Sequence, residues 1–106
     1  MVKKFQVWDI WYAEYAYEDE PECSKDRPVL IINVNPLNLV MLKITSQGPR
    51  DSYDYTIKKW REAGLKEESH IRMLHRLSAK EEDFRRKIGS LHEVDRLCLK
   101  LKLSRL

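Results

Sequence analysis

The sequence predicts a single, mainly β (α+β) domain, in which a small barrel-like sheet carries short helices and ends in a C-terminal α-helix. Residues 25–32 and 40–47 contain runs of β-branched and large apolar side chains, which are typical of strands. Residues 35–38, Asn-Pro-Leu-Asn, have turn chemistry, so the two runs predict a hairpin. Apolar residues recur at helical intervals from Val94 to Leu101, which predicts the final helix.

Length and composition are those of one folded domain spanning residues 1–106. A hydrophobic fraction of 42% beside 35% charged residues favours a soluble globular protein over a disordered chain. Twenty Lys and Arg against 17 Asp and Glu give a net charge of +3, which permits a polyanionic partner without requiring one.

The sequence also predicts a cytoplasmic protein that does not enter a membrane. Cys23 and Cys98 have neither the pairing pattern of a disulfide framework nor the spacing of a metal site. Residues 1–5 lead into a strand-like segment without the apolar core of a signal peptide. No apolar run approaches the roughly 18 residues that a membrane span needs.

The first strand is expected at residues 5–12, where apolar side chains occupy both alternation phases, as in a strand that curls into a barrel. Residues 14–25 lack an apolar period and contain the acidic, proline-bearing cluster 19–22, which predicts a long exposed loop. Residues 48–51, Gly-Pro-Arg-Asp, break the chain after the hairpin. Residues 53–57 then alternate as a short fourth strand.

The next segment is expected to turn and then extend again. Residues 58–63 predict one or two helical turns, ended by Gly64 in a left-handed cap. Trp60 and Leu65 are available to pin these turns to the barrel. Residues 69–74 predict the fifth strand.

Two capping-box spacings follow. Residues 78–81, Ser-Ala-Lys-Glu, predict a short helix that ends near Arg85. Residues 86–89 predict a last short strand. Residues 90–93, Ser-Leu-His-Glu, repeat the spacing and predict the start of the C-terminal helix.

A candidate phosphate site lies at one end of the predicted hairpin. Arg27 stands at the entry of the first hairpin strand, and Thr45, Ser46 and Gln47 stand at the exit of the second. The start of one antiparallel strand lies beside the end of its neighbour. We therefore expect a guanidinium and two hydroxyls to share one edge of the sheet.

In this chain Arg27-Pro28 is followed by four aliphatics, and a later strand closes on Ile44-Thr45-Ser46-Gln47. This pattern resembles the MazF/PemK (Kid-like) toxins of bacterial toxin-antitoxin pairs. The resemblance also covers Trp8-Asp9-Ile10-Trp11, Ser69-His70-Ile71-Arg72 and Lys87-Ile88-Gly89-Ser90-Leu91. This chain has Trp8 where the family usually has glycine before the Asp. It has Cys23-Ser24-Lys25-Asp26 where the family usually has glycines before the Arg.

The resemblance implies an SH3-like barrel and a homodimer, with single-stranded RNA as substrate and a cognate antitoxin as partner. It places the cleavage site on Arg27 and Thr45. The implied reaction is metal-independent cleavage through the 2′-hydroxyl, with no cofactor. These residue types suit that chemistry, because a planar cation and a neutral donor stabilise charge on pentavalent phosphorus. An arginine with a pKa above about 12 is a poor base, so we assign Arg27 to transition-state stabilisation.

Other site residues are assigned through the same resemblance. Glu22 matches the acidic residue of the family's loop and is a candidate to orient Arg27 or to act as the general base. The alternative is one more solvated acid in an acidic run. The residues expected to bind RNA are Ser46, Gln47, Arg72 and Tyr17. The three histidines lack metal-ligand spacing, so we assign no metal and expect surface roles for them.

Two alternatives remain open at this point. One is a binding toxin on the same barrel, like the gyrase-poisoning CcdB toxins. The other is a degenerate relative that keeps the fold without the activity, since fold alone does not fix function. The presence of both Arg27 and Thr45 favours the nuclease.

Overall fold

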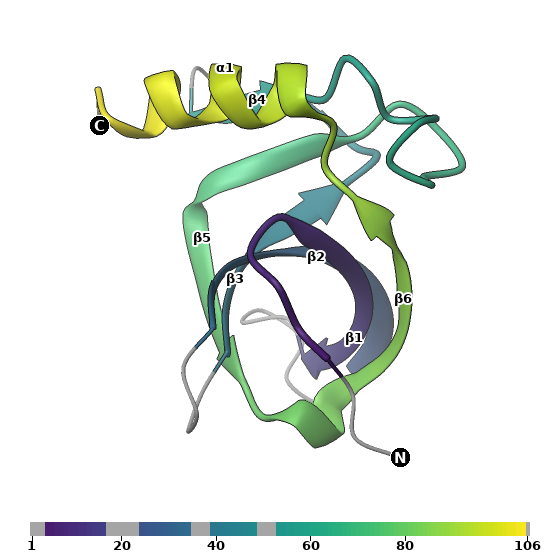
Figure 1. Cartoon of the computed structure of the whole chain (residues 1–106). Coiled ribbons are helices and arrows are strands. Elements are labelled where there is room, and N and C mark those ends of the chain that lie inside the picture. The colour runs from purple at the N-terminus through teal and green to yellow at the C-terminus, as the bar shows by residue number, and fades with distance from the viewer. Residues whose placement is uncertain (1–3, 17–23, 35–38, 49–52, 106) are drawn as a thin grey trace.

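The computed structural model describes residues 4–16, 24–34, 39–48 and 53–105. These residues form a six-stranded antiparallel sheet in the order β4-β5-β3-β2-β1-β6, which curls strongly, with α1 lying across one end (Figure 1). The predicted mainly β fold with a C-terminal helix is therefore confirmed. The elements are β1 (Asp9–Ala16), β2 (Ser24–Val34), β3 (Leu39–Thr45), β4 (Asp54–Thr56), β5 (His70–Ala79), the 3-10 helix η1 (Glu81–Asp83), β6 (Phe84–Ser90) and α1 (Glu93–Leu103).

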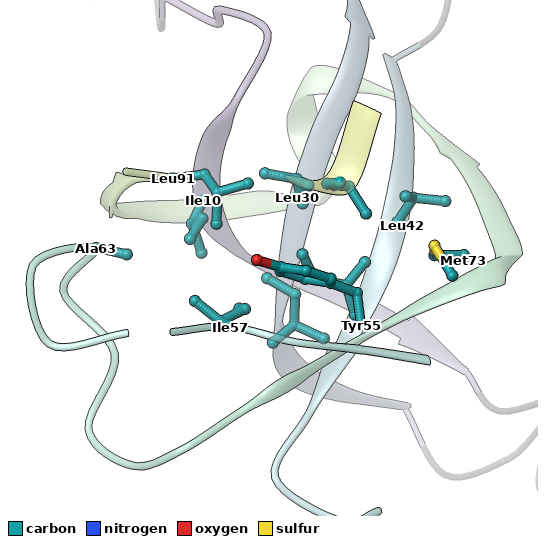
Figure 2. Packing of buried hydrophobic residues seen from close by; sticks show 11 residues of the cluster. Ile10, Leu30, Leu42, Tyr55, Ile57, Ala63, Met73 and Leu91 are labelled. Carbon is teal, nitrogen blue, oxygen red and sulfur yellow. The ribbon is translucent and has the colours of Figure 1, made fainter. Parts of the chain in front are cut away.

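Each face of the sheet is covered by its own apolar cluster. Along β2, Leu30 belongs to one cluster while Val29 and Ile31 belong to the other, which is why both alternation phases of this strand are apolar. The helix-side cluster lies between the sheet and α1 (Figure 2) and comprises Ile10, Leu30, Leu42, Ile44, Tyr55, Ile57, Ala63, Ile71, Met73, Leu91 and Leu99. The opposite-face cluster comprises Trp11, Ala13, Val29, Ile31, Leu39, Met41 and Phe84.

The first strand begins later than predicted, at Asp9, because the chain turns just before it. Trp8 has a φ of 80°, in the left-handed region that favours glycine. Two hydrogen bonds hold it there, from Trp8 N to Ile31 O and from Leu91 N to Trp8 O, both at 2.8 Å. Glycine would adopt this conformation with less strain than tryptophan does.

The predicted bounds of the loop, residues 14 and 25, are both wrong. β1 continues to Ala16 and β2 already begins at Ser24, and the two strands pair through Glu14 with Asp26 and Ala16 with Ser24. Cross-strand pairing outweighs the poor strand propensity of the charged residues here. Residues 17–23, which include Glu22 and Tyr17, lie outside the described residues.

The hairpin prediction is confirmed, since β2 and β3 pair antiparallel from Val34 to Val29. β5 is longer than expected and bends sharply in its middle (Figure 1). The bend coincides with a break in the β3–β5 register, where Leu42 pairs with Arg76 but Lys43 pairs with Arg72. Such bulges increase twist and redirect a strand.

The segment after β4 turns where predicted and ends at Gly64, but residues 58–64 form hydrogen-bonded turns and not a regular helix. Gly64 has a φ of 93°, and Leu65 N donates to Trp60 O at 3.0 Å, which closes the turn in the manner of a left-handed cap. A Cβ at Gly64 would lie 2.6 Å from Ile88 O, so only glycine lets this turn approach β6 so closely.

Neither predicted capping box forms. Ser78 lies inside β5, and η1 begins after Lys80, whose backbone N donates to Asp83 Oδ2 at 3.1 Å. Ser90 lies in β6 and its hydroxyl donates to Asp9 Oδ1. His92 caps α1 instead, its Nδ1 accepting from Val94 N at 3.2 Å. Because both serines lie in strands, Lys80 and His92 take the N-cap positions instead.

Asp95 ties α1 to the segment after β4. Its carboxylate is fully buried and accepts hydrogen bonds from Tyr55 Oη at 2.5 Å, Lys58 N at 2.9 Å and Lys59 N at 2.8 Å. Burial, and then the hydrogen bond to Asp95, raises the pKa of Tyr55 well above its usual range. One buried carboxylate therefore satisfies three donors, one of them buried and two partly buried, and fixes the position of the helix.

Candidate functional site

The strand register places Arg27 on the sheet face opposite to α1. Arg27 pairs with Ala13 of β1, and residues directly opposite each other in an antiparallel pair point to the same face. Ala13 belongs to the opposite-face cluster. Because β2 begins at Ser24, Arg27 lies inside the strand and is half-buried there.

Thr45 lies on the same face and at the same end of the hairpin. The last pair of the β2–β3 ladder joins Val29 to Lys43, so Lys43 shares the face of Val29. Thr45 follows Lys43 by two residues and therefore points the same way. Arg27 and Thr45 each lie two residues beyond that last pair.

The strands β4 and β5 extend this polar region. Thr45 pairs with His70, which also pairs with Thr56, while Lys43 pairs with Arg72, which also pairs with Asp54. One end of the face is thus apolar and the other end is polar. We call the polar end the polar face, which consists of Arg27, Lys43, Thr45, Asp54, Thr56, His70 and Arg72.

His70 is not the surface residue that the sequence predicted. It is 3% exposed, and its Nδ1 lies 2.9 Å from Thr56 Oγ1. His70 pairs with a neighbouring strand on each side, Thr45 of β3 and Thr56 of β4. Within the described ranges, no three His, Cys, Asp or Glu side chains gather in an arrangement that could hold a metal ion.

Arg72 is held on two sides. Its Nη1 donates to Asp54 Oδ2 in an ion pair whose side chains are 8% and 5% exposed. Its Nη2 donates to the backbone oxygen of Gln47 at 2.8 Å. Gln47 N in turn donates to Thr45 Oγ1 at 3.1 Å. The guanidinium predicted to touch RNA is thus buried and linked to Thr45 through Gln47, and RNA contact by Arg72 stays a prediction.

Ser46 and Gln47 lie just beyond β3 with exposed side chains, beside Thr45. Lys43 and Asp54 belong to the polar face although the sequence analysis did not single them out. Alternation along β3 could have found Lys43, which is in phase with Thr45. Asp54 could not be found without the β4–β5 register.

The comparisons with known proteins agree on one family. Residues 6–105 match the family model for the PemK-like, MazF-like toxins of type II toxin-antitoxin systems. The chain belongs to this family. Membership implies that the toxin has an antitoxin partner. Arg27 and Thr45, which the sequence analysis predicted to form the cleavage site, both lie on the polar face described above.

A solved structure supports the fold assignment. The chain is similar to the Mycobacterium tuberculosis toxin MazF-mt6, with 20% sequence identity, a TM-score of 0.72, and coverage of 92% of this chain and 93% of that chain. No curated protein sequence matches significantly. Among the described residues of this toxin, no helix has the length and apolar character to cross a membrane.

Proposed function

We propose that this MazF-like toxin is a sequence-selective endoribonuclease that cleaves single-stranded RNA in the cytoplasm without a metal ion. The observation that carries the proposal is the register that gathers Arg27, Thr45 and Lys43 on one face at one end of the hairpin. A guanidinium, an ammonium and a hydroxyl on one face form a set of donors suited to a phosphate.

In the proposed reaction the 2′-hydroxyl of RNA attacks the adjacent phosphorus and the bond to the 5′-oxygen breaks. The products are a 2′,3′-cyclic phosphate and a 5′-hydroxyl. Negative charge builds on the non-bridging oxygens as the phosphorus becomes pentavalent. Arg27 stabilises that charge with its fork of donors, because a preorganised cation costs little reorganisation when the charge develops.

Thr45 supplies a second, neutral donor. Its Oγ1 already accepts a hydrogen bond from Gln47 N at 3.1 Å. A hydroxyl has one proton and two lone pairs, so this bond leaves the proton free to be donated to a phosphate oxygen. The backbone of Gln47 thereby favours the donor role of Thr45 over an acceptor role.

The proton of the 2′-hydroxyl must reach a base, and the departing 5′-oxygen takes a proton from solvent water to become the 5′-hydroxyl. We propose Glu22 as the base, since a carboxylate accepts a proton at neutral pH and an arginine does not. Ser46, Gln47 and Tyr17 are proposed to hold the RNA strand, with tyrosine offering a stacking face for a base.

The proposed function is tested by incubating the purified toxin with a long RNA of mixed sequence in buffer containing EDTA, and by mapping the new 5′ ends. We expect discrete ends that share a sequence motif and carry a 5′-hydroxyl. Activity that is lost in EDTA and restored by magnesium would overturn metal independence. Intact RNA, together with inhibited DNA supercoiling by gyrase, would favour the binding toxin instead.

We also propose that the toxin is a homodimer that associates through α1. Val94, Leu97 and Leu101 form an apolar stripe on the helix and are 42%, 63% and 53% exposed. The helix carries Glu93 in its first turn and Lys100 in its last turn. Two copies packed antiparallel about a two-fold axis would bury both stripes and place the acidic turn of each beside the basic turn of the other.

The substitution Leu97→Glu should therefore make the toxin monomeric at micromolar concentration, because it places a charge in the centre of the apolar contact. Light scattering measures the mass. The matched control is Leu74→Glu, which alters a leucine of β5 that is 60% exposed and lies off the helix. A wild-type toxin that is monomeric, or a dimer that Leu97→Glu leaves intact, would contradict this proposal.

A further inference from the structure

Asp54 and Arg72 form an ion pair that lies between β4 and β5. The two residues pair directly in the register of these strands, and Arg72 Nη1 donates to Asp54 Oδ2. Both side chains are at least nine-tenths buried. Because a charge buried without its partner is strongly disfavoured, the pair holds each side chain in one orientation.

Arg72 uses its other nitrogen to hold the backbone beyond β3. Nη2 donates to Gln47 O at 2.8 Å, and Gln47 N donates to Thr45 Oγ1 at 3.1 Å. β3 ends at Thr45, so Gln47 lies outside its ladder. Hydrogen bonds that meet at the Gln47 backbone thus connect a buried carboxylate on β4 to the hydroxyl that we propose as a donor to the scissile phosphate.

We propose that Asp54 and Arg72 are positioning residues of the nuclease site, which hold Gln47 so that its backbone N–H keeps the Thr45 hydroxyl turned to donate to the phosphate. This inference rests on the proposed function. Asp54 acts through Arg72, and Arg72 acts through the Gln47 backbone. Misplacing a reacting group slightly costs rate even when the group itself is intact.

Positioning and direct contact with RNA predict different kinetics for Arg72. A residue that only orients Thr45 changes kcat and leaves KM and its salt dependence unchanged, because it makes no contact with substrate in the ground state. A residue that binds a backbone phosphate raises KM, and its loss lowers the slope of log affinity against log salt by about one.

The test substitutes Asp54→Asn, which removes the charge that holds Arg72 and touches no predicted substrate contact. We expect kcat to fall by roughly ten-fold or more, within the range for loss of one oriented donor, with KM within about two-fold of wild type. In a Thr45→Ala background the same substitution should cost almost nothing further, because the group that it orients is already absent. Amide hydrogen exchange at Gln47 should become faster in Asp54→Asn.

Two further variants guard against a purely structural effect. Asp95→Asn also weakens a buried carboxylate, but on α1, and should keep the wild-type kcat at temperatures where it is folded. If Asp54→Asn does not fold, Arg72→Lys replaces it as the test variant. One ammonium cannot hold both Asp54 and Gln47 in the geometry of a guanidinium. Arg72→Lys should show the same lack of further loss in the Thr45→Ala background.

Full additivity with Thr45→Ala, or a loss confined to KM with a reduced salt slope, would overturn the positioning role. An unchanged exchange rate at Gln47 would also overturn it. If the wild-type toxin does not cleave RNA at all, the proposed function fails and the nuclease role of the pair fails with it. Gln47 exchange would then still show whether the chain of hydrogen bonds exists, so the two failures are distinguishable.

Discussion

Arg27→Ala is expected to lower the rate of RNA cleavage by at least about 10² to 10³, the range for loss of one preorganised donor to a developing oxyanion. Thr45→Ala should lower it somewhat less, because a neutral hydroxyl stabilises the charge less than a guanidinium does. If both residues act on one phosphate, the double mutant should be hardly slower than Arg27→Ala alone. Single-turnover cleavage of a short RNA containing the mapped site measures all three.

Two controls separate this loss from unfolding or from a general loss of positive charge. Arg76→Ala removes an exposed arginine of β5, paired with Leu42, and should cleave within about two-fold of wild type. Arg27→Lys keeps the charge but should rescue poorly, because a point ammonium cannot grip two phosphate oxygens in one plane. A folded Arg27→Ala toxin that still cleaves within a few-fold of the wild-type rate would remove the basis of the site.

The largest effect on stability is expected at Asp95. Asp95→Ala leaves three donors without their acceptor, namely the buried Tyr55 Oη and the partly buried backbone N atoms of Lys58 and Lys59. Losing these bonds should cost about 3 to 5 kcal/mol of unfolding free energy. For a domain of this size, that corresponds to a fall in Tm of roughly 12 °C or more. Thermal unfolding followed by circular dichroism measures it.

A graded series of variants tests whether Asp95 anchors the helix. Tyr55→Phe removes one of the three bonds and should cost about 1 kcal/mol. Asp95→Asn retains one acceptor oxygen and should fall between Tyr55→Phe and Asp95→Ala. Glu93→Ala, which removes an exposed carboxylate in the first turn of the same helix, should cost less than about 1 kcal/mol. An Asp95→Ala toxin as stable as Glu93→Ala would contradict the anchoring role of Asp95.

Local patterns in the sequence are sufficient to predict the central hairpin and the last helix. The aliphatic runs of β2 and β3 and the apolar period of α1 persist in the fold because burial follows the same alternation and helical period. The glycine at position 64 predicts the end of the turn for a similar reason. Its φ of 93° is one that glycine adopts readily and other residues do not. These signals are local, so a single sequence carries them.

The composition of the polar face depends on strand register, which joins residues that are far apart in the sequence. Asp54 belongs to it only because β4 pairs with β5 at Arg72, and His70 belongs to it because β5 pairs with β3 at Thr45. Ser78 and Ser90 have the spacing of helix caps in the sequence, but strand pairing places them in β5 and β6. Arg27 and Thr45 were placed by the family resemblance together with the hairpin, and strand register brings them onto one face.

The most direct test of the nuclease account uses an RNA in which only the nucleotide on the 5′ side of the mapped cleavage site carries 2′-deoxyribose. The account requires the 2′-hydroxyl of that nucleotide as the nucleophile, so cleavage at the site should disappear while the RNA still binds and competes with the all-ribose substrate. Cleavage of the substituted RNA at the same position and a similar rate would contradict it.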